Sequence, residues 1–163
     1  KNYPYTTLKA HGISVGMPSN ADMGNSEVGH NALGAGQVYS QGASLVANAI
    51  ADKTIFDADS WKEISDNAKI EGNTLHLMGL FSDGNVHSHI DHLKALVLQA
   101  KTDGVKVVRI HALIDGRDVP ATSGLDYTEP FEAWMANLND TNFDVCIASG
   151  GGRQKITIFL LFN

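Results

Sequence analysis

The second half of the chain alternates between apolar runs and segments whose apolar residues have helical spacing. Residues 74–80, 105–114 and 143–148 are short runs of aliphatic and β-branched side chains, which favours buried strands. Between them, residues 88–102 and 122–138 place apolar side chains three and four positions apart, as amphipathic helices do. Strands that alternate with helices pair in parallel, because each helix supplies the crossover to the next strand. The pattern therefore predicts an α/β fold with a parallel sheet.

The flanking residues predict where helices begin and end. Ser88 is expected to cap the helix of residues 88–102, and Gly104 follows its end. Earlier in the chain, helices are expected from Ser26 onward, over 43–51 and over 59–67. The side chains expected to be buried on the helices are Trp61, Ile64, Ile90, Leu93, Leu96, Val97, Ala100, Leu125, Phe131, Trp134, Met135 and Leu138.

A polar, glycine-containing segment follows each of the three predicted strands. The segments are SDGNVHS at residues 82–88, DGRD at 115–118 and SGGGR at 149–153. Ligands of open α/β sheets bind beyond the carboxyl ends of the strands, so we expect His87, Arg117, Asp118 and Arg153 to converge there. Guanidinium groups bind carboxylate and phosphate through two hydrogen bonds, and consecutive glycines can expose N–H groups to an anion. A small dianion is the ligand that this set favours.

Each of these residues also has a purely structural interpretation. His87 could cap the following helix, and the aspartates at 115 and 118 could stabilise a tight turn. Arg153 could be an ordinary surface arginine after a strand. Ser26 could be a helix cap, although a serine hydroxyl at a helix N-terminus can also act as a nucleophile toward phosphorus, where the helix dipole stabilises an anion.

Composition narrows the class of protein. The 163 residues are 43% hydrophobic with a net charge of −6, which is typical of a globular protein and argues against a general nucleic-acid binder. No apolar run reaches the roughly 18 residues of a membrane span. The single cysteine, Cys146, is expected in the core. One cysteine allows no internal disulfide, which fits a reducing cytoplasm. His89 and His92 are expected on the surface rather than at a metal, and His76 and His111 in strands with satisfied hydrogen bonds.

Four motifs in order carry a resemblance to a known family. The string DMGNSEVGHNALGAG at residues 22–36 closely resembles the nucleophile motif of cofactor-independent phosphoglycerate mutase, of the alkaline phosphatase superfamily. SDGNVHS, DGRD and ASGGGR follow in the family's order. The resemblance runs from about residue 9 to residue 153.

The resemblance implies a fold, a reaction and roles for five residues. Residues 1–40 would be part of a phosphatase-like domain that carries the nucleophile, and 41–163 an incomplete transferase domain that binds substrate. Ser26, a ligand of one of two Mn²⁺ or Mg²⁺ ions, would accept the phosphoryl group as 2- and 3-phosphoglycerate interconvert in glycolysis. His87, Arg117, Asp118 and Arg153 would bind the glycerate, with Asp118 acting on its hydroxyl. No 2,3-bisphosphoglycerate would be required, and the full-length protein would be a cytoplasmic monomer without nucleic-acid or membrane partners.

Two alternatives remain, and the ends of the chain bear on them. The chain could belong to another phosphatase or phosphomutase of the superfamily, or it could be a non-catalytic phosphoglycerate-binding fragment. The match to the family breaks at about Gln154, and the family's other metal ligands are missing. We therefore expect the chain to be a fragment that is inactive by itself.

Overall fold

The computed structural model of the chain describes residues 3–153. These residues fall into two compact units, and the division lies between Asn48 and Ala49. The assignment of residues 1–40 to a phosphatase-like domain and of 41–163 to a transferase domain concerns the identity of the parts, and it stays a prediction.

The first unit contains a 3-10 helix, η1 (Gly12–Val15), the helix α1 (Ser26–Ala35) and most of α2 (Gly42–Ala51). Helix α1 begins at Ser26 as predicted, but its cap is the preceding residue. The Asn25 side chain accepts a hydrogen bond from the backbone N–H of Val28 at 3.0 Å, which satisfies one of the unpaired donors of the first turn. The interpretation of Ser26 as the cap is therefore wrong, and its hydroxyl is not used for that purpose.

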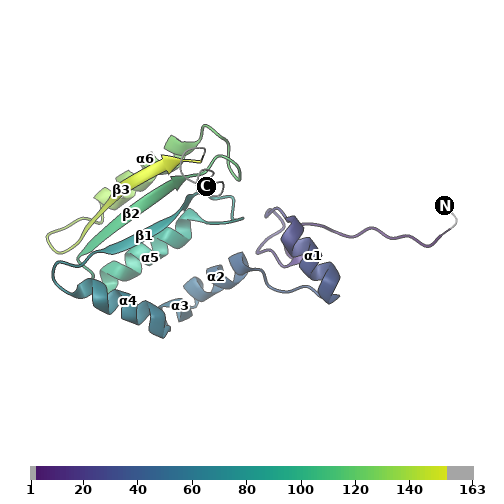
Figure 1. Ribbon diagram of the computed structural model, residues 1–163, viewed down its shortest axis with the longest axis horizontal. Coiled ribbons are helices and arrows are strands. Elements are labelled where there is room, and N and C mark those ends of the chain that lie inside the picture. Colours follow the sequence, from purple (N-terminus) through teal and green to yellow (C-terminus); the bar gives the residue numbers. More distant parts are fainter. Residues whose placement is uncertain (1–2, 154–163) are drawn as a thin grey trace, which may run out of the picture. The chain divides into compact units, whose positions relative to one another are not determined.

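The second unit is a three-stranded parallel sheet with helices, so the predicted α/β class is confirmed. The strand order is β1-β2-β3, the order in the sequence (Figure 1). The elements are α3 (Thr54–Asp57), α4 (Asp59–Lys69), β1 (Leu75–Phe81), α5 (Ile90–Thr102), β2 (Val107–Ile114), α6 (Gly124–Ala136) and β3 (Asp144–Gly152).

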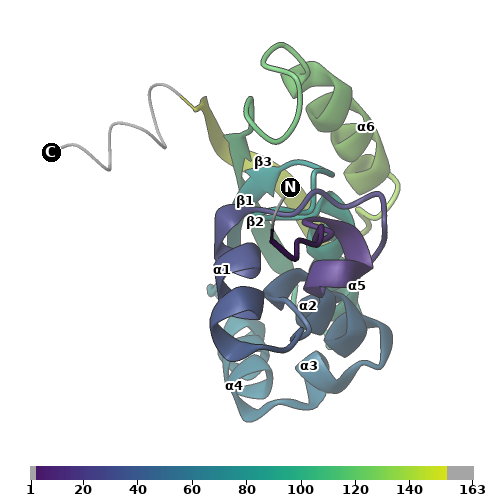
Figure 2. The same cartoon turned by 90° about the vertical axis from the view of Figure 1, so that its right-hand side faces the viewer.

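The two faces of the sheet differ in what covers them. Helices α5 and α6 lie on the same face (Figure 2). On that face, Val108 and Ile110 are fully buried, and the rings of Phe81 and Phe131 meet edge to face with centroids 5.0 Å apart. These buried side chains place the core of the unit on this face. Fully burying one such side chain contributes about 1.5–3 kcal/mol of stability. The opposite face is more open, and Met78 there is 71% exposed.

A β-bulge interrupts the pairing of β2 with β3. Ile110 pairs with Ile147, but the next residue, His111, pairs with Ser149, so Ala148 is an extra residue in β3. A line of hydrogen bonds crosses the open face at this level: His76 Nδ1 lies 2.9 Å from His111 Nε2, and His111 Nδ1 lies 2.6 Å from the Ser149 hydroxyl. The expectation that both histidines have satisfied hydrogen bonds is confirmed.

Several helix details differ from the sequence prediction. Helix α5 begins at Ile90, and the His89 side chain caps it by accepting the N–H of Asp91 at 3.2 Å, so Ser88 is not the cap. His89 and His92 are half-buried rather than exposed, and burial lowers the pKa of His92, with a further lowering from His89 partly offset by Asp91. Ile64 and Leu125, expected in the core, are 51% and 66% exposed.

Other predicted core residues are confirmed. Trp61, Ile90, Val97, Ala100, Phe131 and Met135 are buried, and Leu93, Leu96, Trp134 and Leu138 pack against them. Cys146 is only half-buried. Strand β3 runs on to Gly152 instead of ending at residue 148, because the glycines continue the ladder with β2. The SGGG segment is therefore strand and not a loop.

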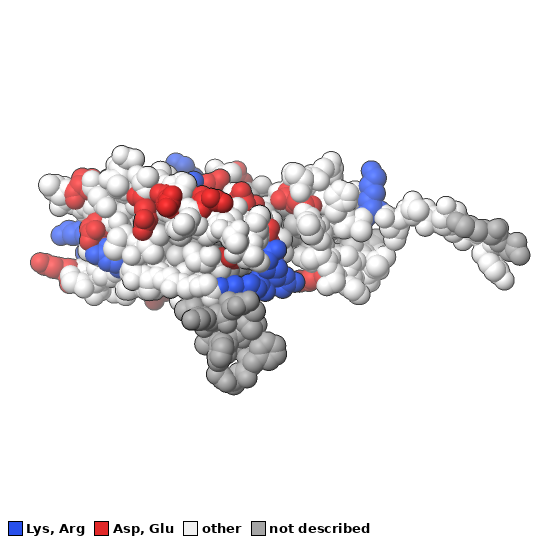
Figure 3. Space-filling model, turned by 90° about the horizontal axis from the view of Figure 1, so that it is seen from above, with Lys and Arg blue, Asp and Glu red and all other residues white. Residues whose placement is uncertain are grey.

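Acidic side chains are spread over the face of the molecule seen in Figure 3, while lysines and arginines gather in small groups. Within residues 3–153, no helix has the length and apolar character needed to cross a membrane.

Candidate functional site

Ser26 stands at the first position of α1 with its side chain exposed. Its hydroxyl forms no hydrogen bond with another described residue, whereas its backbone carbonyl lies 2.5 Å from His30 Nδ1. The chain before it is held tightly, because a Cβ on Gly24 would lie 2.2 Å from the carbonyl oxygen of Ala10. This arrangement presents an unused hydroxyl at the positive end of a helix, where unpaired N–H groups favour an anion.

The loop after β1 is organised by Ser82, a buried polar residue that is 1% exposed. Its hydroxyl accepts the N–H of Gly84 at 3.1 Å, and its carbonyl accepts the N–H of Ile90, the first residue of α5, at 2.8 Å. The loop that contains His87 is thus tied at both of its ends to one buried serine.

The loop after β2 is a tight turn around Asp115, whose side chain has no exposed surface. One carboxylate oxygen, Oδ1, accepts the N–H groups of Gly116, Arg117 and Asp118 at 2.7, 2.9 and 3.3 Å. Burial raises the pKa of the Asp115 carboxyl, but hydrogen bonds from the backbone N–H groups and from the Ser82 hydroxyl outweigh burial and leave this pKa below its ordinary value. The interpretation of Asp115 as the residue that stabilises a turn is confirmed.

The two loops are packed directly against each other. A Cβ added to Gly84 would lie 2.9 Å from both the Cβ and the carbonyl oxygen of Asp118. Helix α6 joins the first loop as well, since the Tyr127 hydroxyl donates to Asp83 Oδ1 at 2.7 Å. That hydrogen bond, with burial and nearby carboxylates, raises the pKa of Tyr127 to about 12, so the phenol remains a donor at neutral pH.

The end of β3 brings Arg153 to the same place. Its Nη1 lies 3.9 Å from Asp115 Oδ1, and its side chain is 29% exposed. Asp118 is half-buried against Gly84, whereas the side chains of Arg117 and His87 are exposed and make no hydrogen bond or ion pair with another described residue. The contacts therefore join Asp118 and Arg153 to one cluster, and they leave His87 and Arg117 on the loops that this cluster supports.

Sequence reasoning missed Ser82, Asp83 and Tyr127 as parts of this site. Ser82 and Asp83 stand in the SDGNVHS motif, so their place after a strand was a usable signal. Tyr127 lies 44 residues from Asp83 in the chain, and no local pattern marks that contact.

The described residues do not form the metal centre that the resemblance implies. Mn²⁺ and Mg²⁺ are held by several carboxylate, carbonyl or imidazole ligands. Among residues 3–153, no three His, Cys, Asp or Glu side chains are grouped so that they could hold a metal ion. Ser26 thus stands as a single candidate ligand, and no chemistry through a metal is derived from this structure.

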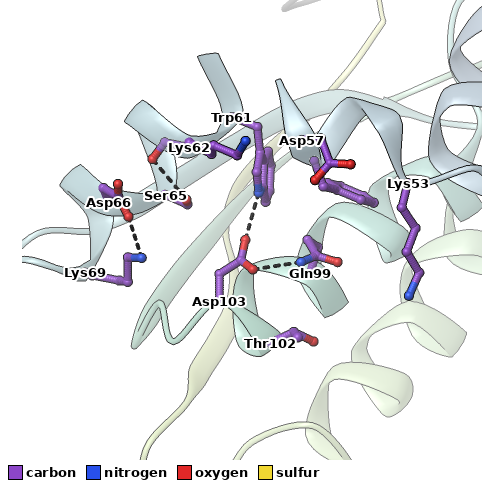
Figure 4. Close-up of a pocket in the computed structure, with 11 residues that line it drawn as sticks. Lys53, Asp57, Trp61, Lys62, Ser65, Asp66, Lys69, Gln99, Thr102 and Asp103 are labelled. Atoms are coloured by element: carbon purple, nitrogen blue, oxygen red, sulfur yellow. Dashed lines mark hydrogen bonds and ion pairs between the residues drawn. The ribbon is translucent and has the colours of Figure 1, made fainter. Parts of the chain in front are cut away.

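A separate cavity of about 390 Å³ lies between α3, α4 and the carboxyl end of α5 (Figure 4). Three lysines and three aspartates line it, so it has no excess of positive charge for an anion. Its interior hydrogen bonds run from Trp61 Nε1 and Gln99 Nε2 to the two oxygens of Asp103, at 2.8 and 2.7 Å. Since the carboxyl end of α5 leads into the amino end of β2, the cavity lies away from the loops of the candidate site.

Comparison with known proteins gives consistent matches. Residues 46–157 match the family model described as BPG-independent PGAM N-terminus. A probable 2,3-bisphosphoglycerate-independent phosphoglycerate mutase of Leptospira interrogans is 57% identical over 156 residues, which are 96% of this chain and 28% of that protein. The 2,3-bisphosphoglycerate-independent phosphoglycerate mutase 1 of Arabidopsis thaliana is 49% identical, over 94% of this chain and 27% of its own length.

A solved structure agrees with these sequences. A crystal structure of Leishmania mexicana phosphoglycerate mutase at low cobalt concentration superposes with a TM-score of 0.86 and 50% identity. It covers 90% of this chain, which in turn covers 27% of that one. The chain therefore spans little more than a quarter of the length of these relatives.

Proposed function

Because the chain belongs to the BPG-independent phosphoglycerate mutase family, we propose that it supplies the nucleophile and part of the substrate site for the interconversion of 2- and 3-phosphoglycerate. In this proposal Ser26 receives the phosphoryl group, and the loops at the carboxyl ends of the strands bind the glycerate. The observation that carries the proposal is the cluster around Asp115, which unites the loops of DGRD and SDGNVHS with Arg153.

The chemistry of the loops suits a small molecule with a carboxylate and a phosphate. Arg117 and Arg153 offer guanidinium groups, which bind either anion through two parallel hydrogen bonds. His87 adds an imidazole donor on the neighbouring loop. With these three side chains the second unit has donors for both ends of phosphoglycerate.

The proposed reaction has two balanced steps. In the first, the Ser26 oxygen bonds to phosphorus as the phosphorus–oxygen bond of the substrate breaks, the serine loses its proton and the released glycerate oxygen gains one. In the second, the other glycerate hydroxyl attacks the phosphoserine and loses its proton, the bond between phosphorus and the serine oxygen breaks, and that oxygen gains a proton to regenerate Ser26. Asp118 is proposed to exchange these protons with the glycerate hydroxyls, as a carboxylate within hydrogen-bond reach of a hydroxyl can.

The part played by Mn²⁺ or Mg²⁺ belongs to the same proposal, but no step is assigned to the ion. A bound divalent ion would supply a Lewis acid that lowers the pKa of a serine hydroxyl. Ser26 is the candidate ligand, and the described residues offer no completed site around it.

Binding of 3-phosphoglycerate to the 163-residue chain, measured by titration calorimetry, tests the substrate site. We expect Arg117→Ala and Arg153→Ala each to weaken binding at least tenfold, since a hydrogen bond to a charged group is worth about 1.5–3 kcal/mol and a tenfold change is about 1.4 kcal/mol. Arg109→Ala is the matched control, because Arg109 pairs with Asp144 at the amino end of β3, 2.5 Å away. Equal binding by all four proteins would refute the proposed site.

The nucleophile is tested separately by turnover of 3-phosphoglycerate with Mn²⁺ and without 2,3-bisphosphoglycerate. In a protein extended to the length of the relatives, mass spectrometry should find the phosphoryl group on Ser26 and none after Ser26→Ala, whereas the 163-residue chain by itself is expected to give no phosphoserine. A phosphoryl group on another residue would refute the role of Ser26. Binding that depends on the two arginines but gives neither turnover nor phosphoserine would identify the chain by itself as a binding fragment.

A further inference from the structure

The most unusual polar group in the second unit is the carboxylate of Asp115. Its side chain has no exposed surface, and one of its oxygens receives three backbone N–H groups. The other oxygen, Oδ2, is buried and has no hydrogen-bond partner among the described residues. A buried acceptor without a partner loses the hydrogen bonds that water would give it, and the loss is larger for a charged acceptor. The turn therefore carries an electrostatic cost that its shape alone does not explain.

A neutral residue could keep the geometry of the turn, although its hydrogen bonds would be weaker than those to a charged acceptor. An asparagine has the same shape, and its carbonyl oxygen could accept the same three N–H groups. The negative charge also faces a cationic side chain. Within residues 3–153, the ion pair of Asp115 is with Arg153, whose Nη1 lies 3.9 Å from Oδ1.

Asp115 is also linked to the loop that contains His87. The Ser82 hydroxyl helps to lower the pKa of the Asp115 carboxyl and accepts the N–H of Gly84, and Gly84 in turn packs against Asp118. One carboxylate thus touches the turn of Arg117 and Asp118, the serine that ties down the neighbouring loop, and the arginine at the end of β3.

We propose that Asp115 is a positioning residue, whose charge holds the Arg153 guanidinium in the orientation that binds the anionic substrate while its Oδ1 fixes the turn of Arg117 and Asp118. This inference deepens the proposed function and rests on it for the identity of the ligand. Asp115 itself does not touch the substrate, and it acts through Arg153 and through the backbone of the turn.

The direction in which Asp115→Asn changes the affinity for 3-phosphoglycerate distinguishes a positioning role from a purely electrostatic one. Asp115→Asn removes a negative charge beside an anion site, and charge removal alone should tighten binding of a dianion. Loss of the orientation of Arg153 should weaken it. We expect Asp115→Asn to bind 3-phosphoglycerate at least tenfold more weakly in calorimetry, with amide NMR shifts of Gly116, Arg117 and Asp118 close to those of the wild type. Asp144→Asn, an equal change of charge at the other end of β3, should change the affinity less than twofold.

A double-mutant cycle shows whether the effect passes through Arg153, because residues that act as a unit are not additive. In an Arg153→Ala background, Asp115→Asn should cause no further loss of affinity. The same tenfold loss in both backgrounds would mean a general structural role, and wild-type affinity in Asp115→Asn would mean that the charge is not needed. Either result overturns the proposal. If Asp115→Asn does not fold, Ser82→Ala serves as the second variant: it keeps the charge of Asp115, so the Nε–H NMR signal of Arg153 should stay in place, and a shift of that signal would overturn the role of the charge.

A measurement without substrate keeps this inference distinct from the proposed function. The Nε–H NMR signal of Arg153 should shift in Asp115→Asn and stay in place in Asp144→Asn. If the wild-type chain does not bind 3-phosphoglycerate, the proposed function fails, and the Arg153 signal still decides whether Asp115 holds the guanidinium. An Arg153 signal unmoved by Asp115→Asn overturns the inference whatever the chain binds.

Discussion

Gly84→Ala should destabilise the second unit by forcing apart the two loops that meet at its candidate site. The new Cβ would lie 2.9 Å from the Asp118 Cβ, 2.9 Å from its carbonyl oxygen and 3.2 Å from the Ser82 hydroxyl. Favourable carbon contacts lie at about 3.5–4.0 Å, so the neighbours would have to move by more than half an ångström. Neither a carbonyl oxygen nor a Cβ can rotate away without moving the backbone. We expect a cost of about 1–3 kcal/mol, the usual range for an overpacked site.

Thermal unfolding followed by circular dichroism measures this cost. Each kcal/mol should lower the midpoint by about 2–8 °C for a unit of this size. Gly116→Ala is the matched control, because it lies in the neighbouring loop but its Cβ would meet Ala121 at an ordinary 3.5 Å. We expect the control to change stability by less than about 0.5 kcal/mol. A Gly84→Ala protein as stable as the wild type would refute the close packing of the two loops.

Three further predictions concern the core, a cap and acid stability. Phe131→Ala should cost about 3–5 kcal/mol in urea unfolding, because Phe131 is 1% exposed and packs edge to face on Phe81; exposed Glu132→Ala should be nearly neutral, and a similar loss in both would contradict the assignment of the core. Asn25→Ala should speed hydrogen exchange at the Val28 amide about fivefold, for a lost cap of about 1 kcal/mol; an unchanged rate there would argue against the cap. Because the pKa of Asp115 is lowered in the folded state, its contribution to stability is present above the pKa of the unfolded carboxyl, about 3.9, and is lost as pH falls through the folded pKa. Urea unfolding toward acid pH should therefore show a smaller loss for Asp115→Asn than for the wild type, and parallel losses would contradict the shift.

The sequence predicted the elements better than their ends. Periodicity placed all three strands and their connecting helices, because apolar spacing directly reflects which face is buried. The caps went wrong by one residue, at Asn25 and His89, because neighbouring polar side chains compete for the same first-turn N–H groups and local sequence does not decide between them. The SGGG segment was taken for a loop because glycine has little strand preference, yet pairing with β2 holds it in the sheet.

The site was predictable in its residue types and less so in its connections. Glycine-rich polar segments after three strands pointed to one edge of the sheet, and Asp118 and Arg153 do meet a common cluster there. The tight turn at Asp115 was also visible in the sequence. The links from Ser82 to Asp115 and from Tyr127 to Asp83 depend on how loops far apart in the chain pack together, and such tertiary contacts leave no periodic signal.

The β-bulge at Ala148 determines which face of the sheet each later residue of β3 occupies. Side chains of a strand alternate between faces, so one extra residue exchanges the two faces for all later positions. With Ala148 present, Ser149 reaches His111 on the open face. In a regular ladder of the same sequence, Ala148 would pair with His111 instead, Ser149 would point toward the helix-covered core, and the later positions of the strand would exchange faces. The extra residue, five positions before Arg153, thus sets the face of the sheet on which β3 delivers each residue of its glycine-rich end.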